Sequence, residues 1–178
     1  MAKKMGLPVA EKPESQEICF VPDDDYPGFL KGRIPGVFRP GPIVDLNGRV
    51  IGGHAGTGNF TIGQRRGLGV AAPRPLYVIA IDAASNTVVA GPDEVLRGKS
   101  LLASGLTLVS GGKLEGPVRA RVKIRYKHAE EKAIITPRGK SGARIDFDRP
   151  QRAMTPGQAV VFYSRNTVLG GATIEKAL

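Results

Sequence analysis

The sequence has a single cysteine, no tryptophan, and aromatic residues that make up only 6% of the chain. One cysteine forms no internal disulfide, which fits a reducing compartment such as the cytoplasm. The low aromatic content argues against a large stacking platform for single-stranded nucleic acid. His54 and His128 have no further ligands at metal-binding spacing, so no metal site is expected. No apolar run approaches the roughly 20 residues of a membrane-spanning helix. These absences predict a cytoplasmic protein without a membrane segment.

Acidic residues are scarce in the second half of the chain. Residues 1–96 hold 10 basic and 10 acidic side chains, whereas residues 97–178 hold 16 basic and 6 acidic ones. The whole formal charge of +10 therefore lies in the C-terminal half. A localised basic excess is typical of proteins that bind a polyanion such as a nucleic acid. A solvated surface that is merely basic would give the same counts.

The patterning predicts a mainly β fold with many tight turns, since the chain contains 24 glycines and 14 prolines. A short helix is expected within residues 23–33. Two hairpins are expected at 42–51, around an Asn-Gly pair, and at 76–90. Short strands bounded by turn residues then predict a small closed barrel. We expect its six strands at about residues 100–109, 117–126, 131–136, 143–148, 158–163 and 167–175.

One of these strands, residues 118–127, alternates apolar and basic residues. Side chains on one face of a strand repeat about every 6.6 Å, so its cations form a row with little local neutralisation. Such a row predicts contact with an anionic backbone, although a solvated outer face is the alternative. The apolar positions are Val118, Ala120, Val122, Ile124 and Tyr126, and the basic positions are Arg119, Arg121, Lys123, Arg125 and Lys127.

The glycine-rich segment 59–69 is a second candidate for binding. Its glycines permit a close approach of the backbone to a ligand. Gln64, Arg65 and Arg66 offer hydrogen-bond donors to phosphates and base edges. A glycine-rich turn with exposed arginines explains the same residues equally well.

The single cysteine, Cys19, is the candidate for chemistry. Its neighbours Ile18, Phe20 and Val21 are apolar, and a free cysteine in such surroundings is commonly buried and inert. The nearest charges in sequence are acidic and would raise the pKa of the thiol. The residues alone therefore leave a core position and a reactive position open.

The segment Ser15-Gln16-Glu17-Ile18-Cys19-Phe20 resembles the S-Q-[DE]-[IL]-C-F motif of bacterial tRNA-specific 2-thiouridylases. The segment 60–69, Phe-Thr-Ile-Gly-Gln-Arg-Arg-Gly-Leu-Gly, is similar to that family's [YF]-T-I-G-Q-R-[KR]-G-L-G. Residues 155–163 and 168–171 are similar to the end of the family's C-terminal domain. The likeness covers roughly residues 8–175.

This resemblance implies a fold and a set of roles. The fold is a small central α+β domain at about residues 23–95, followed by a C-terminal six-stranded antiparallel β-barrel at about 97–178, similar to barrels of translation factors. Residues 1–22 would be a linker from an N-terminal PP-loop domain. Cys19 matches the cysteine that carries a persulfide, while Arg125, Tyr126 and Gln158 match positions that touch tRNA.

The resemblance also implies a reaction. Family members replace the C2 oxygen of the wobble uridine with sulfur in tRNAs for Lys, Glu and Gln. The PP-loop domain uses ATP and Mg to adenylate that oxygen, a sulfur-donor protein supplies the persulfide, and a second cysteine helps to release the sulfur.

Two of this chain's departures from the family's pattern bear on its activity. It contains no S-G-G-x-D-S loop and no second cysteine. We therefore expect it to be part of a larger protein, to bind no cofactor itself, and to be inactive in thiolation alone. The alternative is a non-catalytic RNA-binding β-barrel module. No glycine-rich strand–turn–helix for a methyl donor is present, so methyl transfer is rejected.

Overall fold

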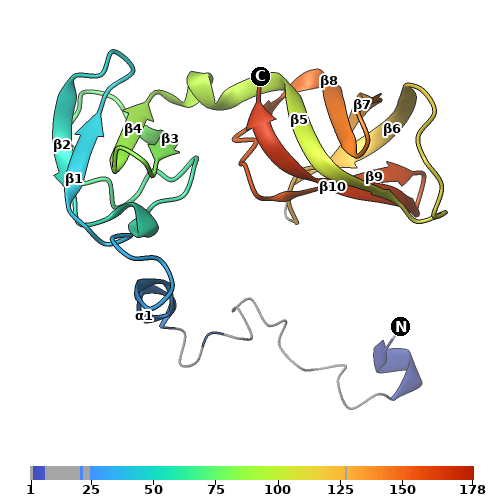
Figure 1. The fold of residues 1–178 in the computed structure, drawn as a ribbon, viewed down its shortest axis with the longest axis horizontal. Coiled ribbons are helices and arrows are strands. Elements are labelled where there is room, and N and C mark those ends of the chain that lie inside the picture. The colour runs from blue at the N-terminus through green and yellow to red at the C-terminus, as the bar shows by residue number, and fades with distance from the viewer. Residues whose placement is uncertain (1, 7–20, 22–24, 127) are drawn as a thin grey trace.

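The computed structural model describes residues 2–6, 21, 25–126 and 128–178. Within these residues the chain builds a small four-stranded sheet and then a six-stranded barrel, which lie apart along the molecule's long axis (Figure 1). Cys19 and its motif lie outside the described residues, as does Lys127. No helix among the described residues is long and apolar enough to cross a membrane.

The described residues before the sheet form two short helices. One is a single 3-10 turn, η1 (Ala2–Met5), which ends at Gly6 with φ of +64°. The other is α1 (Tyr26–Lys31), whose N-cap is Asp25: its carboxylate accepts a hydrogen bond of 2.9 Å from the Gly28 amide. This confirms the short helix expected within residues 23–33 and explains the value of an acidic residue at its start.

The sheet has the strand order β2-β1-β4-β3, in which β1 and β4 are parallel and the other pairs are antiparallel. Both expected hairpins are present. The first turns at Gly48, with φ of +81°, and the Asp45 carboxylate accepts hydrogen bonds from the amides of Asn47 and Arg49. The elements are β1 (Gly41–Val44), β2 (Val50–His54), η4 (Thr57–Asn59), β3 (Tyr77–Asp82), β4 (Thr87–Gly91) and the 3-10 turn η5 (Asp93–Leu96).

The barrel closes in the order β10-β5-β8-β7-β6-β9, with every neighbouring pair antiparallel. This confirms the predicted six-stranded barrel. Alternate residues of each strand point inward and form one apolar core that includes Leu101, Ile145 and Phe162. The strands are β5 (Arg97–Leu108), β6 (Val118–Lys123), β7 (Glu131–Arg138), β8 (Gly142–Arg152), β9 (Ala159–Ser164) and β10 (Thr167–Ala177).

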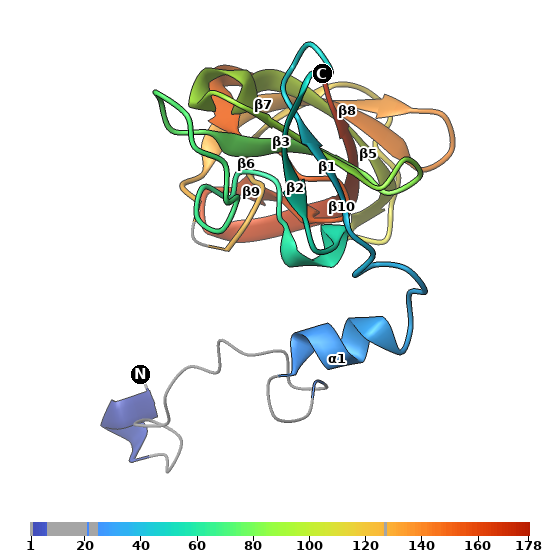
Figure 2. The same cartoon turned by 90° about the vertical axis from the view of Figure 1, so that its left-hand side faces the viewer.

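The sheet and the barrel are joined through Arg152, at the end of β8. Its Nε donates to an Asp93 carboxylate oxygen at 2.7 Å, and another guanidinium nitrogen donates to the Gly63 carbonyl at 3.3 Å. The guanidinium carbon also lies 5.2 Å from the centroid of the Tyr77 ring. Three segments distant in sequence therefore converge on one side chain, and Figure 2 shows the sheet overlying the barrel in the view along the long axis.

Candidate nucleic-acid interface

The basic residues of β6 lie on the outer face of the barrel, between β7 and β9. Arg121 is directly opposite Lys132 on β7 and Tyr163 on β9, and Lys123 is opposite Val161 on β9. Directly opposite residues of antiparallel strands share a face. This outer face therefore combines cations with an aromatic ring, while Ala120 and Val122 point into the core.

Two open cavities lie next to each other on this face and share Tyr163. The first, here named the tyrosine cavity, has a volume of about 490 Å³. Its lining residues are Lys123, Ile124, Arg125, Tyr126, Gln158, Ala159, Val161 and Tyr163. The structure thus brings Arg125, Tyr126 and Gln158 together, although Gln158 lies more than 30 positions along the chain.

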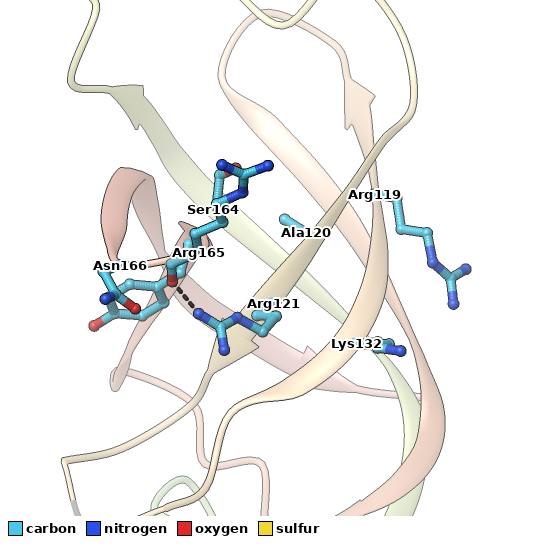
Figure 3. Close-up of a pocket in the computed structure, with 8 residues that line it drawn as sticks. Arg119, Ala120, Arg121, Lys132, Ser164, Arg165 and Asn166 are labelled. Carbon is cyan, nitrogen blue, oxygen red and sulfur yellow. Dashed lines mark hydrogen bonds between the residues drawn. The ribbon is translucent and has the colours of Figure 1, made fainter.

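The second cavity, here named the turn cavity, has a volume of about 470 Å³. It lies at the turn between β9 and β10 and is drawn in Figure 3. Its lining residues are Arg119, Ala120, Arg121, Lys132, Tyr163, Ser164, Arg165 and Asn166. Four of these eight residues are cationic, so the cavity is suited to an anion.

Arg125 occupies an unusual position at the edge of the tyrosine cavity. Its guanidinium donates hydrogen bonds to the carbonyls of Arg152 and Ala153, the latter at 3.2 Å. Burial, and next the nearby Arg152 charge, lower the pKa of Arg125 below its usual value. Among the described residues, no carboxylate pairs with Arg125. A half-buried cation that lacks a counter-ion among these residues favours the binding of an anionic ligand.

Two buried polar atoms at the tyrosine cavity have no hydrogen-bond partner among the described residues. They are Nε of Arg125 and Oε1 of Gln158. Buried polar groups in folded proteins are nearly always paired, so each unpaired one indicates a missing partner. One of these atoms is a donor and the other an acceptor, which is the combination needed to recognise a base edge.

The sequence prediction for strand 118–127 was wrong in three details. The strand ends at Lys123, and Tyr126 is 72% exposed instead of facing the core. Arg125 turns away from the row of cations to bond the carbonyls of residues 152 and 153. The row also has local counter-ions, since Arg119 lies 2.5 Å from Asp148 and Arg121 lies 3.2 Å from Glu130.

The predicted residues of the glycine-rich loop do not line either barrel cavity. The Gln64 amide is engaged within the loop: its oxygen accepts from the Thr61 amide at 3.0 Å, and its nitrogen donates to the Arg66 carbonyl at 2.9 Å. Arg65 and Arg66 are exposed, and Arg65 lines a separate cavity of about 580 Å³. A binding role for these three residues stays a prediction.

Two family models match the chain. One, described as "tRNA methyl transferase PRC-barrel domain", covers residues 28–92, and the other, "Aminomethyltransferase beta-barrel domain", covers residues 99–174. The tRNA-specific 2-thiouridylase MnmA 1 of Caldanaerobacter subterraneus is 49% identical over 176 residues, which are 99% of this chain and 48% of that protein. The corresponding MnmA proteins of Symbiobacterium thermophilum and Heliobacterium modesticaldum are 51% and 50% identical, over 100% and 99% of this chain.

This chain belongs to the tRNA-specific 2-thiouridylase family. It spans about half the length of these relatives, since it covers 46% of the Symbiobacterium protein and 46% of the Heliobacterium protein. The two matched regions coincide with the sheet and the barrel. The chain is thus similar to 2-thiouridylases throughout both of its folded units.

The sequence alone did not indicate the roles of three residues of the 2-thiouridylase barrel. Tyr163 and Arg165 line the cavities, and Arg152 joins the barrel to the sheet. Tyr163 ends the expected strand 158–163 and Arg165 lies in the expected turn that follows it, so the turn itself was a usable signal. Nothing in the local sequence distinguishes Arg152 from the other arginines of the barrel.

Proposed function

We propose that this chain is the tRNA-binding part of a tRNA 2-thiouridylase. The observation that carries the proposal is the pair of cavities on the outer face of β6 and β9. Within the described residues they place one unpaired donor, one unpaired acceptor, cations and two tyrosines next to one another, in a chain about 50% identical to named 2-thiouridylases. Cations hold phosphates, while an exposed aromatic ring stacks on an unpaired base.

In this proposal the tyrosine cavity receives a base of the tRNA. Tyr126 and Tyr163 offer their rings for stacking, and Lys123, with Nζ 5.6 Å from the centroid of the Tyr126 ring, adds positive charge beside the ring. The side-chain amide oxygen of Gln158 accepts a hydrogen bond from the base edge, and Arg125 donates one. Gln64, Arg65 and Arg66 would contact a separate stretch of the same RNA.

Cys19 is assigned the chemical step by its motif alone. It would carry a persulfide, because a persulfide anion is a far stronger nucleophile than a thiol. Its terminal sulfur would attack C2 of the adenylated wobble uridine, and AMP would leave with the former C2 oxygen. The second cysteine of the full enzyme would then attack the Cys19 sulfur, which breaks the S–S bond, leaves the terminal sulfur on C2 and forms a disulfide with Cys19. The sulfur would come from a donor protein, and the substrates would be tRNAs for Lys, Glu and Gln in the cytoplasm.

ATP and magnesium belong to this reaction but are not assigned to residues here. Within the described residues, no group of three or more His, Cys, Asp or Glu side chains is suited to a metal ion. We propose that the chain's own contribution is to bind and orient the RNA, and that it does not thiolate tRNA alone. A binding module without any chemistry is the second candidate. The effect of Cys19→Ser on sulfur transfer distinguishes the two candidates.

Binding is tested with the 178-residue chain and unmodified tRNA. We expect the affinity to fall steeply between about 50 and 200 mM salt, because each phosphate contact releases condensed counter-ions. Exchanging Arg121, Lys123 and Arg125 together for Glu should reduce the affinity by at least about tenfold. Salt-independent binding, or no binding by the unchanged chain, would refute the tRNA-binding role.

The chemical assignment needs the full enzyme. Cys19→Ser in that enzyme should abolish sulfur transfer to tRNA while tRNA affinity stays unchanged, because serine cannot form a persulfide. Sulfur incorporation is measured by mass spectrometry of the digested tRNA. Full thiolation by Cys19→Ser would leave the binding-module alternative as the better description of this chain.

A further inference from the structure

The turn between β9 and β10 has a strained arginine at its first position. Ser164 pairs with Thr167, so only Arg165 and Asn166 form the connection. Arg165 has φ of +51°, a left-handed conformation that residues with a Cβ rarely adopt. Glycine or asparagine is the residue expected at such a position. Strain of this kind is concentrated at functional sites, so a functional role is expected for Arg165.

The strained turn forms one wall of the turn cavity. Figure 3 shows the Arg121 side chain directed at the turn, where its guanidinium donates a hydrogen bond to the Arg165 carbonyl. The Arg121 Nε atom also lies 3.2 Å from Glu130 Oε2. Arg121 is thus held in place on both sides and serves as a fixed cation beside the turn.

The remaining cations of the cavity are less neutralised. Lys132, opposite Arg121 on β7, and Arg165 form no ion pair with any described residue. Three cations therefore surround this part of the cavity, with Glu130 as the only carboxylate paired to any of them among the described residues. Asn166 adds a neutral amide. Such a set of donors favours a phosphate over a base or an apolar side chain.

The turn cavity lies beside the tyrosine cavity, two residues further back along β6. Lys123 lines the tyrosine cavity, and Arg121, two residues earlier on the same face of β6, lines the turn cavity. Two such residues are about 6.6 Å apart along a strand. Tyr163, directly opposite Arg121 on β9, contributes to both cavities. A polynucleotide can therefore occupy both cavities without a change of direction.

We propose that the turn cavity, with Arg165 as its outer donor, is a phosphate subsite for the sugar–phosphate backbone of the bound tRNA. This inference rests on the proposed function, because it takes the tyrosine cavity as the neighbouring base subsite. The strained backbone of Arg165 is maintained because it holds a cation at the end of a turn that glycine would form more easily.

The decisive variant is Arg165→Gly, since it separates folding from binding. Glycine relieves the backbone strain, so we expect the melting temperature to rise or stay unchanged. We expect tRNA affinity to fall several-fold, and the slope of log K against log salt to decrease in magnitude by about 1, as for one lost phosphate contact. Arg165→Lys keeps the charge and should retain most of the affinity.

Lys140→Gly is the matched control. Lys140 is an exposed cation in another turn of the barrel, between β7 and β8, and it lines neither the turn cavity nor the tyrosine cavity. Its salt slope should equal that of the unchanged chain. If Arg165→Gly also keeps the full affinity and slope while Gln158→Met weakens binding, the phosphate subsite is refuted and the base subsite stands. If the unchanged chain binds no tRNA, the proposed function itself fails.

Inorganic phosphate distinguishes the two sources of the anion. At equal ionic strength, we expect it to compete with tRNA no better than chloride does, because an open cavity binds one phosphate weakly unless the neighbouring base is also held. Strong competition by phosphate that disappears in Arg165→Gly would instead identify a site for a free anion and overturn the backbone assignment.

Discussion

At the scale of single residues, the barrel carries polar groups that weaken its own stability. Oε1 of Gln158 is buried and has no hydrogen-bond partner in the described part of the chain, and leaving such an atom unpaired costs about 1–3 kcal/mol. Gln158→Met keeps a side chain of similar length without the buried oxygen. We expect its free energy of unfolding to rise by about 1 kcal/mol while its tRNA affinity falls.

Urea denaturation and tRNA titration of Gln158→Met measure the two effects separately. Thr155→Val is a suitable control, because the Thr155 hydroxyl already donates to the Ala153 carbonyl at 3.0 Å and its loss should lower stability. A Gln158→Met protein that is less stable than the unchanged chain would show that its amide oxygen is satisfied in solution, and the argument from an unpaired acceptor would fail.

At the scale of elements, the strands were predictable and the cavities were not. All six barrel strands follow from the alternation of apolar residues between turn residues, since that pattern is local. The position of Tyr126 depends on Arg125, whose partners are 27 and 28 residues away. The contact of β6 with β9, which places Tyr163 beside Arg121, arises only when the barrel closes. Such long-range contacts leave no periodic signal in the sequence.

The glycine-rich loop gives an element-scale prediction. Gly63 has φ of +87°, and a Cβ there would lie 3.1 Å from the Ala153 Cβ and 3.2 Å from an Arg152 guanidinium nitrogen. Gly69, in the same loop, has φ of +67° but no atom within 4 Å of its added Cβ. Both changes to alanine strain the backbone, by about 1–2 kcal/mol each. Only Gly63→Ala should additionally disturb the barrel.

Thermal unfolding of the two alanine variants separates these contributions. We expect Gly63→Ala to have the lower melting temperature and the weaker tRNA affinity, since the added Cβ presses on the side chains of Arg152 and Ala153, the two residues whose carbonyls hold Arg125. Equal behaviour of the Gly63 and Gly69 variants would mean that the loop and the barrel are not coupled through this contact.

At the scale of the whole molecule, the sheet and the barrel are held together by a pH-dependent contact. Asp93 accepts hydrogen bonds from Arg152 at 2.7 Å and from Arg97 at 3.3 Å. The Arg152 hydrogen bond is the main cause that lowers the pKa of Asp93 below its usual 3.8. A carboxyl with a lowered pKa contributes stability that is present above its unfolded pKa and is lost as the pH falls through the folded value.

The contact should therefore persist at neutral pH and weaken only when the pH falls below 3.8. In a nuclear magnetic resonance titration, we expect the Arg152 Nε–H signal to shift with a midpoint below that value, together with the signals of residues around the Gly63 carbonyl. Asp93→Asn should produce the shifted spectrum already at neutral pH. Asp146→Asn is the control: the pKa of Asp146 is lowered too, mainly by Arg144, but it lies within the barrel. A midpoint at or above 3.8 would mean that Arg152 does not bind Asp93 in solution, and the barrel face proposed to bind tRNA would then lack this connection to the sheet.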